Sequence, residues 1–515
     1  MSPTEFPNVS ATLSNFPQPS DLKSTAEQIL TYLIQQEPFR WSNPNHENNV
    51  VVECVEILNC LYPSLLQGQE KISADPNNTS FSAMSVTKIA HVAIETVCKR
   101  LETHAPMRSH RESRPILTYP QSNMPRRLNT LLSIKQPEQR TPEWYEMRNN
   151  LITASSAWKA LGSPAITFSF LKEKVDAYYA RRDAEKMDRE MKMRKETSTL
   201  PLSFGSSDGT DSADSTSTTP ITMDRWLGSD HENSPLTWGK RYEPLSVMLY
   251  EKRYSTIIQE YGCIIHPKHG YIGASPDGIN YKKGSPIIGR MLEIKNVYTR
   301  IINGTPKEEY WIQMQLQMEV CDLNECDFLE TKFNEFTSYT EYVAARENWI
   351  QIGETPFLNG SVDMHFGTIA AFSTTRPEHE GGIYYEYCPV GLNLDEQDTW
   401  LNQIREAREA EGYHWYRAIY WQLVEFSCVL VFRNRSWFNA VLPKLDEFWK
   451  RVMYYRTNES EWKVLRDKKR TARAIAKDFK DATSSVINPN SKFRNTSGSS
   501  INSGVCLLNL RGNQS

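Results

Sequence analysis

The chain lacks the paired cysteines that build metal clusters and disulfide frameworks. Its 515 residues include nine cysteines, and none of them forms a Cys-x-x-Cys pair. An odd number of scattered cysteines is typical of reduced thiols inside a cell. Structural zinc and iron–sulfur sites need closely spaced ligands, so we expect neither kind of site.

Long apolar runs and a strong excess of one charge are missing too. No stretch of about 18 apolar residues occurs, which argues against a membrane span. The first residues, "MSPTEFPNVSATLSNFPQPS", have neither the basic start nor the apolar segment of a secretory signal. We therefore expect an intracellular, reducing compartment. The formal net charge is −3, so any nucleic acid would have to bind a local patch.

The length favours roughly two or three domains. Residues 1–20 are rich in Pro, Ser and Asn, and we expect them to be flexible. Apolar residues at helical spacing predict a helical N-terminal domain from residue 21, with a linker up to 135. Residues 136–460 should form a second domain. Residues 461–515 should be a tail that is first basic and then rich in Ser and Asn.

The second domain contains the pattern of an α/β unit. Its elements are a helix, two strands ("GYIGASPDGINY" and "GRMLEIKNVY"), a helix ("EEYWIQMQLQMEV") and a strand ("CDFLETKF"). Further on, "YWQLVEFSCVLVFRN" predicts a strand and "WFNAVLPKLDEFWKRVMYY" a closing helix. Residues 197–222 are of low complexity and should be a disordered insertion. Residues 337–412 are predicted to be an extra insertion.

The two predicted strands form a hairpin in which charged residues are concentrated. Side chains alternate along a strand, so Glu293 and Lys295 share one face while Leu292 and Ile294 point into a core. A glycine turn lets the strand that carries Asp277 return beside Glu293. Two neighbouring carboxylates repel each other unless a cation or proton lies between them. Mg²⁺ prefers oxygen ligands of this kind.

A divalent ion beside a lysine is suited to phosphodiester hydrolysis. The ion would polarise a phosphoryl oxygen, and Lys295 would orient the attacking water and offset negative charge on the phosphate. The alternative is an exposed hairpin in which Glu293 and Lys295 form a surface pair worth ~0–1 kcal/mol. Acids and a lysine at this spacing are common, so the hairpin alone leaves both interpretations open.

Five motifs occur in order: Arg148 with Thr153-Ala-Ser, Gly-x2-Tyr-Glu from Gly239, GASPDG, LEIK, and Tyr-x2-Gln-x-Gln-x-Gln from Tyr310. Together they resemble the lambda-exonuclease-like, YqaJ-type viral recombinase nucleases of the PD-(D/E)XK superfamily, and they point to a large DNA virus. The resemblance covers about residues 136–336 and again 413–455. It implies an α/β, restriction-endonuclease-like core, in which helices flank a central mixed sheet, beside the helical N-terminal region.

The resemblance also implies a metal site and a pocket for a 5′-phosphate. The catalytic residues would be Glu243, Asp277, Glu293 and Lys295. Two Mg²⁺ or Mn²⁺ ions would be bound by Glu243, Asp277, Glu293 and the main-chain carbonyl of Ile294. The phosphate pocket would be formed by Arg148, Ser155, Ser275 and Gln313. Arginine is suited to bidentate phosphate contact, and hydroxyl and amide groups supply further donors.

The implied function is a Mg²⁺- or Mn²⁺-dependent DNA exonuclease that degrades duplex DNA from 5′ to 3′ in viral recombination, repair or replication. The implied partners are DNA, further copies of the chain in a dimer or trimer, and a single-strand annealing protein or helicase. The implied setting is the host cytoplasm or a viral replication site. Two alternatives stay open: an endonuclease, or a flap- or foreign-DNA-cutting enzyme, of the same superfamily, and a non-catalytic DNA-binding recombination scaffold.

Each proposed site residue also has a simpler interpretation. Pro244 directly follows Glu243. Proline fits the first turn of a helix, so the helix that carries Glu243 could start or kink there. Arg148 could pair with a glutamate of its own helix, and Ser155 could cap a helix. Gln313 and Gln317 are four residues apart and could both be solvated. The N-terminal helices could be a protein-interaction module.

Overall fold

The computed structural model describes residues 19–62, 83–101, 106–109, 123–137, 141–197, 234–352, 362–376 and 382–470. The predicted flexible N-terminus up to residue 18, nearly all of the insertion at 197–222, and the tail beyond 470 lie outside these ranges. The chain divides into two compact units, Met1–Met453 and Tyr454–Ser515. In the second unit, residues 459–470 are helical, and the buried Trp462 lies against Tyr455.

The N-terminal region is helical, as predicted. It contains α1 (Pro19–Gln36), η2 (Pro38–Ser42), α2 (His46–Leu61) and α4 (Ala83–Arg100). Leu30 of α1, Leu58 of α2 and Val97 of α4 are fully buried, and the three helices pack on one another. Next, α5 (Met124–Ser133) lies inside the predicted linker. Its Leu128 and Leu131 are buried one turn apart, so this segment packs as a helix.

Short elements then lead to a long helix: α6 (Pro142–Asn149), β1 (Ile152–Thr153), η4 (Ala154–Ser156), α7 (Ala157–Leu161) and α8 (Pro164–Thr197). The side chain of Thr141 caps α6 by accepting a hydrogen bond from the amide of Trp144, as expected for threonine before a helical proline. Residues 180–193 of α8 are exposed. This run is rich in charged side chains, which favour solvent.

The core contains two sheets. One has three strands in the order β1-β4-β3, with β3 at Ile264–Ile265 and β4 at Ile272–Ala274. The other has seven strands in the order β2-β5-β6-β7-β10-β8-β9. Its strands are β2 (Ile258–Gln259), β5 (Gly278–Asn280), β6 (Met291–Val297), β7 (Glu325–Phe336), β8 (Phe366–Ser373), β9 (Ile383–Tyr387) and β10 (His414–Phe432). Because β6 pairs with β7 in parallel and the other pairs are antiparallel, the sheet is mixed, as predicted.

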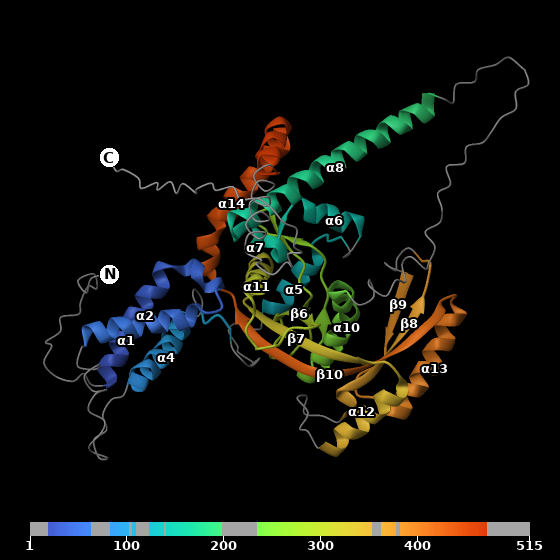
Figure 1. Ribbon diagram of the computed structural model, residues 1–515, viewed down its shortest axis with the longest axis horizontal. Coiled ribbons are helices and arrows are strands. Elements are labelled where there is room, and N and C mark those ends of the chain that lie inside the picture. Colours follow the sequence, from blue (N-terminus) through green and yellow to red (C-terminus); the bar gives the residue numbers. More distant parts are fainter. Residues whose placement is uncertain are drawn as a thin grey trace, which may run out of the picture. The chain divides into compact units, whose positions relative to one another are not determined.

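Helices cover the seven-stranded sheet. They are α10 (Pro235–Tyr254), α11 (Glu308–Cys321), α12 (Tyr339–Ile352) and α13 (Leu394–Ala410), with a short η6 (Val362–Met364). The helix α14 (Arg435–Thr457) follows β10 and packs against α8 and α11. Figure 1 shows α10 on one side of the long strands and α12 with α13 on the other. None of the helices in the described ranges is both long enough and apolar enough to span a membrane.

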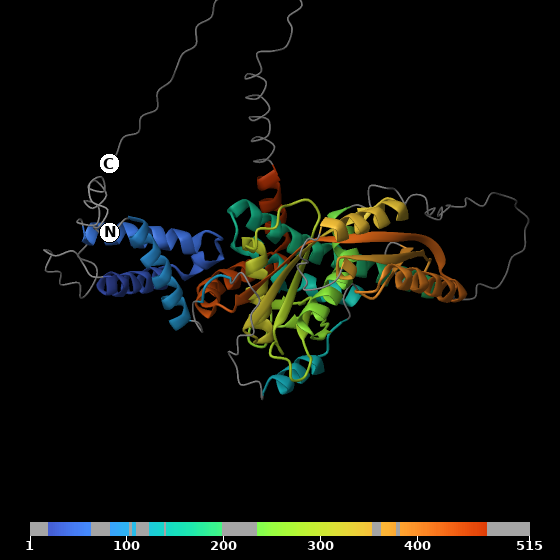
Figure 2. The same cartoon turned by 90° about the horizontal axis from the view of Figure 1, so that it is seen from below.

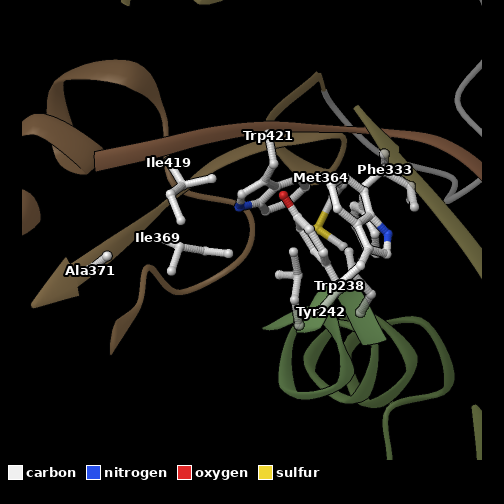
Figure 3. Packing of buried hydrophobic residues seen from close by; sticks show 11 residues of the cluster. Trp238, Tyr242, Phe333, Met364, Ile369, Ala371, Ile419 and Trp421 are labelled. Atoms are coloured by element: carbon white, nitrogen blue, oxygen red, sulfur yellow. The ribbon is translucent and has the colours of Figure 1, made fainter. Parts of the chain in front are cut away.

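An aromatic cluster fixes α10 on the sheet. Trp238 and Tyr242 of α10 point toward Phe333 of β7 and Trp421 of β10 (Figure 3). The Tyr242 and Phe333 rings stack with centroids 4.5 Å apart. Gly367 of β8 leaves the space that the indole occupies, because a Cβ there would lie 2.4 Å from Trp421. Buried aromatic rings dominate packing energies, so this cluster holds the helix that carries Glu243.

Residues 337–412, predicted to be an insertion, supply α12, β8, β9 and α13 to the same sheet. β8 pairs with residues 414–422 of β10, and β7 pairs with residues 420–432. Figure 2 shows β10 bending along its length. Its register shifts between Leu423 and Glu425 against β7, and between Trp415 and Arg417 against β8. Such bulges bend a strand and increase its twist.

Candidate active site

The predicted hairpin forms, but its first strand is divided between the two sheets. β4 ends at Ala274, and β5 begins at Gly278, which lies opposite Leu292 of β6. Pro276 lies between β4 and β5 and has no amide hydrogen for a ladder. The prediction of one continuous strand was therefore wrong. Asp277 lies at the break, immediately before β5.

Asp277 and Glu293 lie next to each other across the hairpin. Oδ2 of Asp277 accepts a hydrogen bond of 2.8 Å from the amide of Ile294. Glu293 has an exposed fraction of 0%. Leu292 and Ile294 pack with Tyr250 of α10 on the opposite face, so the predicted alternation is confirmed. The alternative of an exposed surface pair does not hold, because the glutamate is buried.

Both oxygens of the Glu293 carboxylate have a donor. Lys295 Nζ donates to Oε1, and Gln317 Nε2 donates to Oε2 over 2.8 Å. The exposed fraction of Gln317 is also 0%, so the interpretation of a solvated glutamine was wrong. Gln317 Oε1 has no hydrogen-bond partner in the described part of the chain. Gln317 is therefore a candidate site residue that sequence reasoning missed.

The charges at this site are strongly coupled. Burial raises the pKa of Asp277 well above its usual range, and the neighbouring Glu293 carboxylate raises it further. Lys295 and the Ile294 amide act in the opposite direction. Burial alone would lower the pKa of Lys295, but the Glu293 and Asp277 carboxylates outweigh it and raise that pKa above its ordinary value. The lysine is therefore held in its protonated form.

Glu243 reaches this site from α10. It is half-buried, and its charge contributes to the raised pKa of Asp277. The helix begins at Pro235, where Ser234 caps it, and it continues through Pro244. The prediction that the helix could start at Pro244 was wrong, because the true start has its own capping serine and first-turn proline.

Asn296 ties α10 to the sheet beside the site. Its Oδ1 accepts hydrogen bonds from the hydroxyls of Ser246 (2.6 Å) and Thr331 (2.8 Å). Its Nδ2 donates to the carbonyl of Gly239 over 3.0 Å. Sequence reasoning did not identify Asn296, although it directly follows the catalytic lysine predicted in the LEIK motif. The three contacts set the position of the helix relative to the strand that carries this lysine.

Two of the residues predicted to bind a phosphate, Ser155 and Ser275, come from separate elements and meet at Arg148. Its Nη2 lies 3.1 Å from Ser155 Oγ, and its Nη1 lies 3.5 Å from Ser275 Oγ. The guanidinium also lies over the Trp144 ring, 4.2 Å from the centroid. Burial lowers the pKa of Arg148, but arginine remains charged in proteins. A half-buried cation beside two hydroxyls is suited to binding an oxyanion.

The simpler interpretations of these residues do not hold. Glu146 pairs with Arg181 of α8 over 2.7 Å, while Arg148 turns to the two serines. Ser155 caps neither η4 nor α7. Gln313 has an exposed fraction of only 9%. Its helix, α11, packs against η4 and β4, so one helix connects the predicted phosphate pocket with the Gln317–Glu293 contact one turn further on.

The donor set fits a hard divalent ion. Mg²⁺ and Mn²⁺ prefer carboxylate and carbonyl oxygens such as those of Asp277, Glu293 and the Ile294 main chain. A cation between the two carboxylates would offset the repulsion that helps to raise the pKa of Asp277. Within the described ranges, no three His, Cys, Asp or Glu side chains gather closely enough to hold a metal ion. The ligand role of Glu243 stays a prediction.

Comparisons with known proteins agree with the sequence motifs. Residues 143–324 match the model of the YqaJ-like viral recombinase domain. An uncharacterised protein of Acanthamoeba polyphaga mimivirus, R354, is 30% identical over 254 residues, which cover 45% of this chain and 45% of that relative. Two structures of an alkaline exonuclease from Laribacter hongkongensis, one in complex with dAMP, are 15% and 16% identical, with TM-scores of 0.30. Each covers 63% of this chain and 98% of its own.

The matched range, 143–324, includes every predicted site residue from Arg148 to Gln313. The curated relative is viral, as the resemblance predicted. The mixed sheet, its flanking helices and the family match confirm the predicted fold class. Residues 143–324 are therefore similar to the YqaJ-like viral recombinase domain.

Proposed function

We propose that this chain is a metal-dependent deoxyribonuclease that hydrolyses phosphodiester bonds at DNA ends. The observation that carries the proposal is the pair of adjoining carboxylates, Asp277 and Glu293, with Lys295 against them. Burying two carboxylates that repel each other costs folding free energy. A DNA-binding scaffold gains nothing from two adjoining buried carboxylates, whereas a metal-dependent nuclease needs them to bind its metal ions. The YqaJ-like viral recombinase domain supports the same activity.

The proposed ions are Mg²⁺ or Mn²⁺, and two are proposed. They would bind to Asp277, Glu293, the carbonyl of Ile294 and Glu243. When bound, they would polarise the scissile phosphate and activate water. Gln317 and the Ile294 amide keep the two strand carboxylates oriented. Lys295, held protonated by its acidic neighbours, would orient the attacking water and offset the charge that grows on the phosphate.

The proposed polarity is 5′ to 3′ on duplex DNA. A terminal phosphate monoester carries about two negative charges near neutral pH, whereas each backbone phosphodiester carries one. The pocket of Arg148, Ser155, Ser275 and Gln313 would therefore favour a phosphorylated 5′ end over the interior of a strand. Arg148 would supply the charge-assisted hydrogen bonds, and the hydroxyls would complete the shell.

The proposed setting is viral recombination, repair or replication, in the host cytoplasm or at a viral replication site. The viral relative and the recombinase domain support that setting. The proposed partners are DNA, further copies of this chain in a dimer or trimer, and a single-strand annealing protein or helicase.

The test is digestion of linear duplex DNA labelled at either end, with and without a 5′-phosphate, in Mg²⁺, Mn²⁺ or EDTA. We expect metal-dependent loss from the 5′ end that Asp277→Ala and Lys295→Ala abolish and that removal of the 5′-phosphate slows. The matched control is Lys252→Ala, an exposed lysine on α10, which should cut like the unmodified protein.

Other outcomes would overturn parts of the proposal. Nicking of a circular plasmid would favour the endonuclease alternative, because a circle has no ends. Loss from the 3′ end would refute the polarity and the phosphate pocket. Binding of DNA without cleavage in any metal would favour the recombination scaffold.

A further inference from the structure

A group of cations surrounds Tyr310, beside the predicted catalytic lysine. The centroid of the Tyr310 ring lies 5.1 Å from Lys295 Nζ, 5.9 Å from Arg300 Cζ and 5.8 Å from Lys307 Nζ. Tyr310 is in the first turn of α11, and residues 298–307 form the loop between β6 and α11. All three distances are within the range of cation–π contacts. One ring therefore holds three positive charges close together.

The loop that carries two of these cations is packed in place. Ile302 has an exposed fraction of 7%, and the Asn303 side chain accepts a hydrogen bond of 3.0 Å from the Thr305 amide. Gly304 has a φ of +69°, and a Cβ at this glycine would lie 3.8 Å from Val429 of β10. This left-handed conformation favours glycine. The positions of the cations are therefore set by the fold.

Two of the three cations pair with acids, and Lys295 also lies near the Asp277 carboxylate. Arg300 pairs with Glu330 of β7, which has an exposed fraction of 1%. Lys295 pairs with Glu293. Lys307 is exposed, and no carboxylate forms an ion pair with it in the part of the chain that the structure describes. The Arg300–Glu330 pair alone would be structural, but Lys307 adds a charge that this pair does not need.

A ligand with several regularly spaced negative charges would match this arrangement. Phosphates recur about every 3.4 Å along the axis of one DNA strand, so one strand can present more than one phosphate to the group. Because Lys295 belongs both to the group and to the candidate active site, a phosphate bound here would lie near the one that is cut.

We infer that Arg300, Lys307 and Tyr310 form a subsite for backbone phosphates of the DNA strand that enters the active site. Lys307 and Arg300 contact the phosphates, and the Tyr310 ring holds the cations in position. The inference rests on the proposed nuclease function for its choice of DNA as the ligand.

The test is the salt dependence of binding to a fluorescently labelled linear duplex with a 5′-phosphate, measured by anisotropy in EDTA. Lys307→Gln removes an exposed charge and should leave the fold intact. Each lost phosphate contact should make the slope of log K against log[salt] shallower by about 0.7–0.9. We expect one such step for Lys307→Gln and two for Arg300→Gln with Lys307→Gln. Lys252→Gln on α10 should leave the slope unchanged.

Arg300→Gln would leave the buried Glu330 without its cation and could destabilise the fold. The double variant Arg300→Gln with Glu330→Gln removes both charges, so it tests the Arg300 contact without leaving a buried glutamate unpaired. Its unfolding midpoint is measured beside the binding curve. Unchanged slopes in the variants, together with metal-dependent cleavage by the unmodified protein, would overturn the subsite alone. Shallower slopes without any cleavage would support the subsite and refute the nuclease. Failure of the unmodified protein to bind DNA would overturn both.

Discussion

Replacing Gln317 by leucine should impair the site far more than the fold. Gln317 Nε2 lies 2.8 Å from Glu293 Oε2, and both side chains have an exposed fraction of 0%. A hydrogen bond to a charged group contributes about 1.5–3 kcal/mol, and a buried polar atom without a partner costs about 1–3 kcal/mol. The substitution removes the hydrogen bond to Glu293 and also removes an unpaired polar atom, because Gln317 Oε1 has no partner within the described residues. Because Glu293 Oε2 also loses its donor, we expect the free energy of unfolding to fall by about 1–3 kcal/mol.

Metal-dependent cleavage should fall much further, by about 10- to 100-fold, the usual effect of removing a residue that orients a metal ligand. Glu293 would keep its charge but lose the donor that fixes one of its oxygens. The measurement is the cleavage rate on end-labelled duplex DNA across a Mg²⁺ series. Calorimetry of Mn²⁺ binding, which does not depend on turnover, should show the same weakening. Urea unfolding gives the stability of each variant.

Gln315→Leu is the matched control, because Gln315 is buried on the same helix and points elsewhere. Its Nε2 donates to the carbonyl of Phe432 (2.8 Å) and its Oε1 accepts from the amide of Asn434 (2.6 Å). Leucine would leave two buried backbone groups unsatisfied, at a cost of about 2–4 kcal/mol. The folded protein should respond to Mg²⁺ normally. The reasoning fails if Gln317→Leu loses activity only in proportion to stability, or if Gln315→Leu weakens metal binding equally.

Four further predictions concern stability. Asn296→Ala removes three hydrogen bonds and should lower the free energy of unfolding in urea by about 1–3 kcal/mol. Arg290→Met leaves the buried Asp327 without its cation and should cost about 3–5 kcal/mol. By contrast, Lys450→Ala breaks only an exposed pair and should cost under ~1 kcal/mol. Burial lowers the pKa of His266 to about 4, while unfolded histidine titrates near 6.5. The unfolded chain therefore binds the proton first, and stability should fall by about 1–3 kcal/mol between pH 6.5 and 4. His266→Asn, which keeps an acceptor for the amides of residues 268 and 269, should flatten that part of a pH series of urea unfolding curves. An unchanged pH series would show that the imidazole is not buried in its neutral form.

Local signals account for the parts of the site that the sequence predicted. In β6, Leu292 and Ile294 pack in the core while Glu293 faces the site, as the alternation along a strand predicts. This feature depends on residues within a few positions of one another, where side-chain alternation acts. The pairing of Asp277 with Glu293 needed only one further step, the return of the chain through a glycine turn.

Long-range pairing accounts for much of what the sequence did not predict. β10 begins at His414, whereas the predicted strand begins at Tyr420, because β8 supplies a partner for its first half. The residues of β8 lie about fifty positions earlier in the chain, and no local sequence pattern predicts that pairing. The division of the hairpin at Pro276 is different. Proline shows that a ladder must break there, but it does not show that β4 joins a second sheet.

Gln317 was misjudged because α11 has no solvated face. Every residue from Trp311 to Cys321 is buried, so the helix lacks the amphipathic pattern that separates core from surface. In such a helix, polar side chains must find fixed partners. Gln313 and Gln317 lie on the face toward η4, β4 and Glu293, whereas Gln315 contacts the connection between β10 and α14. The three glutamines are evenly spaced in the sequence, but they therefore face two different sets of neighbours.

The N-terminal region holds both ends of this helix. At the start of α11, Ser42 donates a hydrogen bond of 2.7 Å to Glu308, and Trp311 Nε1 donates to the carbonyl of Arg108 over 2.9 Å. At its end, Arg127 of α5 donates to the carbonyl of Cys321 over 2.8 Å. Cations that bind the last carbonyls of a helix stabilise its C-terminus.

These contacts connect the N-terminal residues with the candidate site through α11. The position of Gln317 against Glu293 depends on where α11 lies along its axis, and contacts from before residue 135 fix the helix at each end. The sheet side of α11 is fixed by Gln315. A displacement of about 1 Å in a positioning group is enough to cost a large factor in rate. The contacts at both ends of α11 therefore favour a role for the N-terminal region in supporting the candidate site.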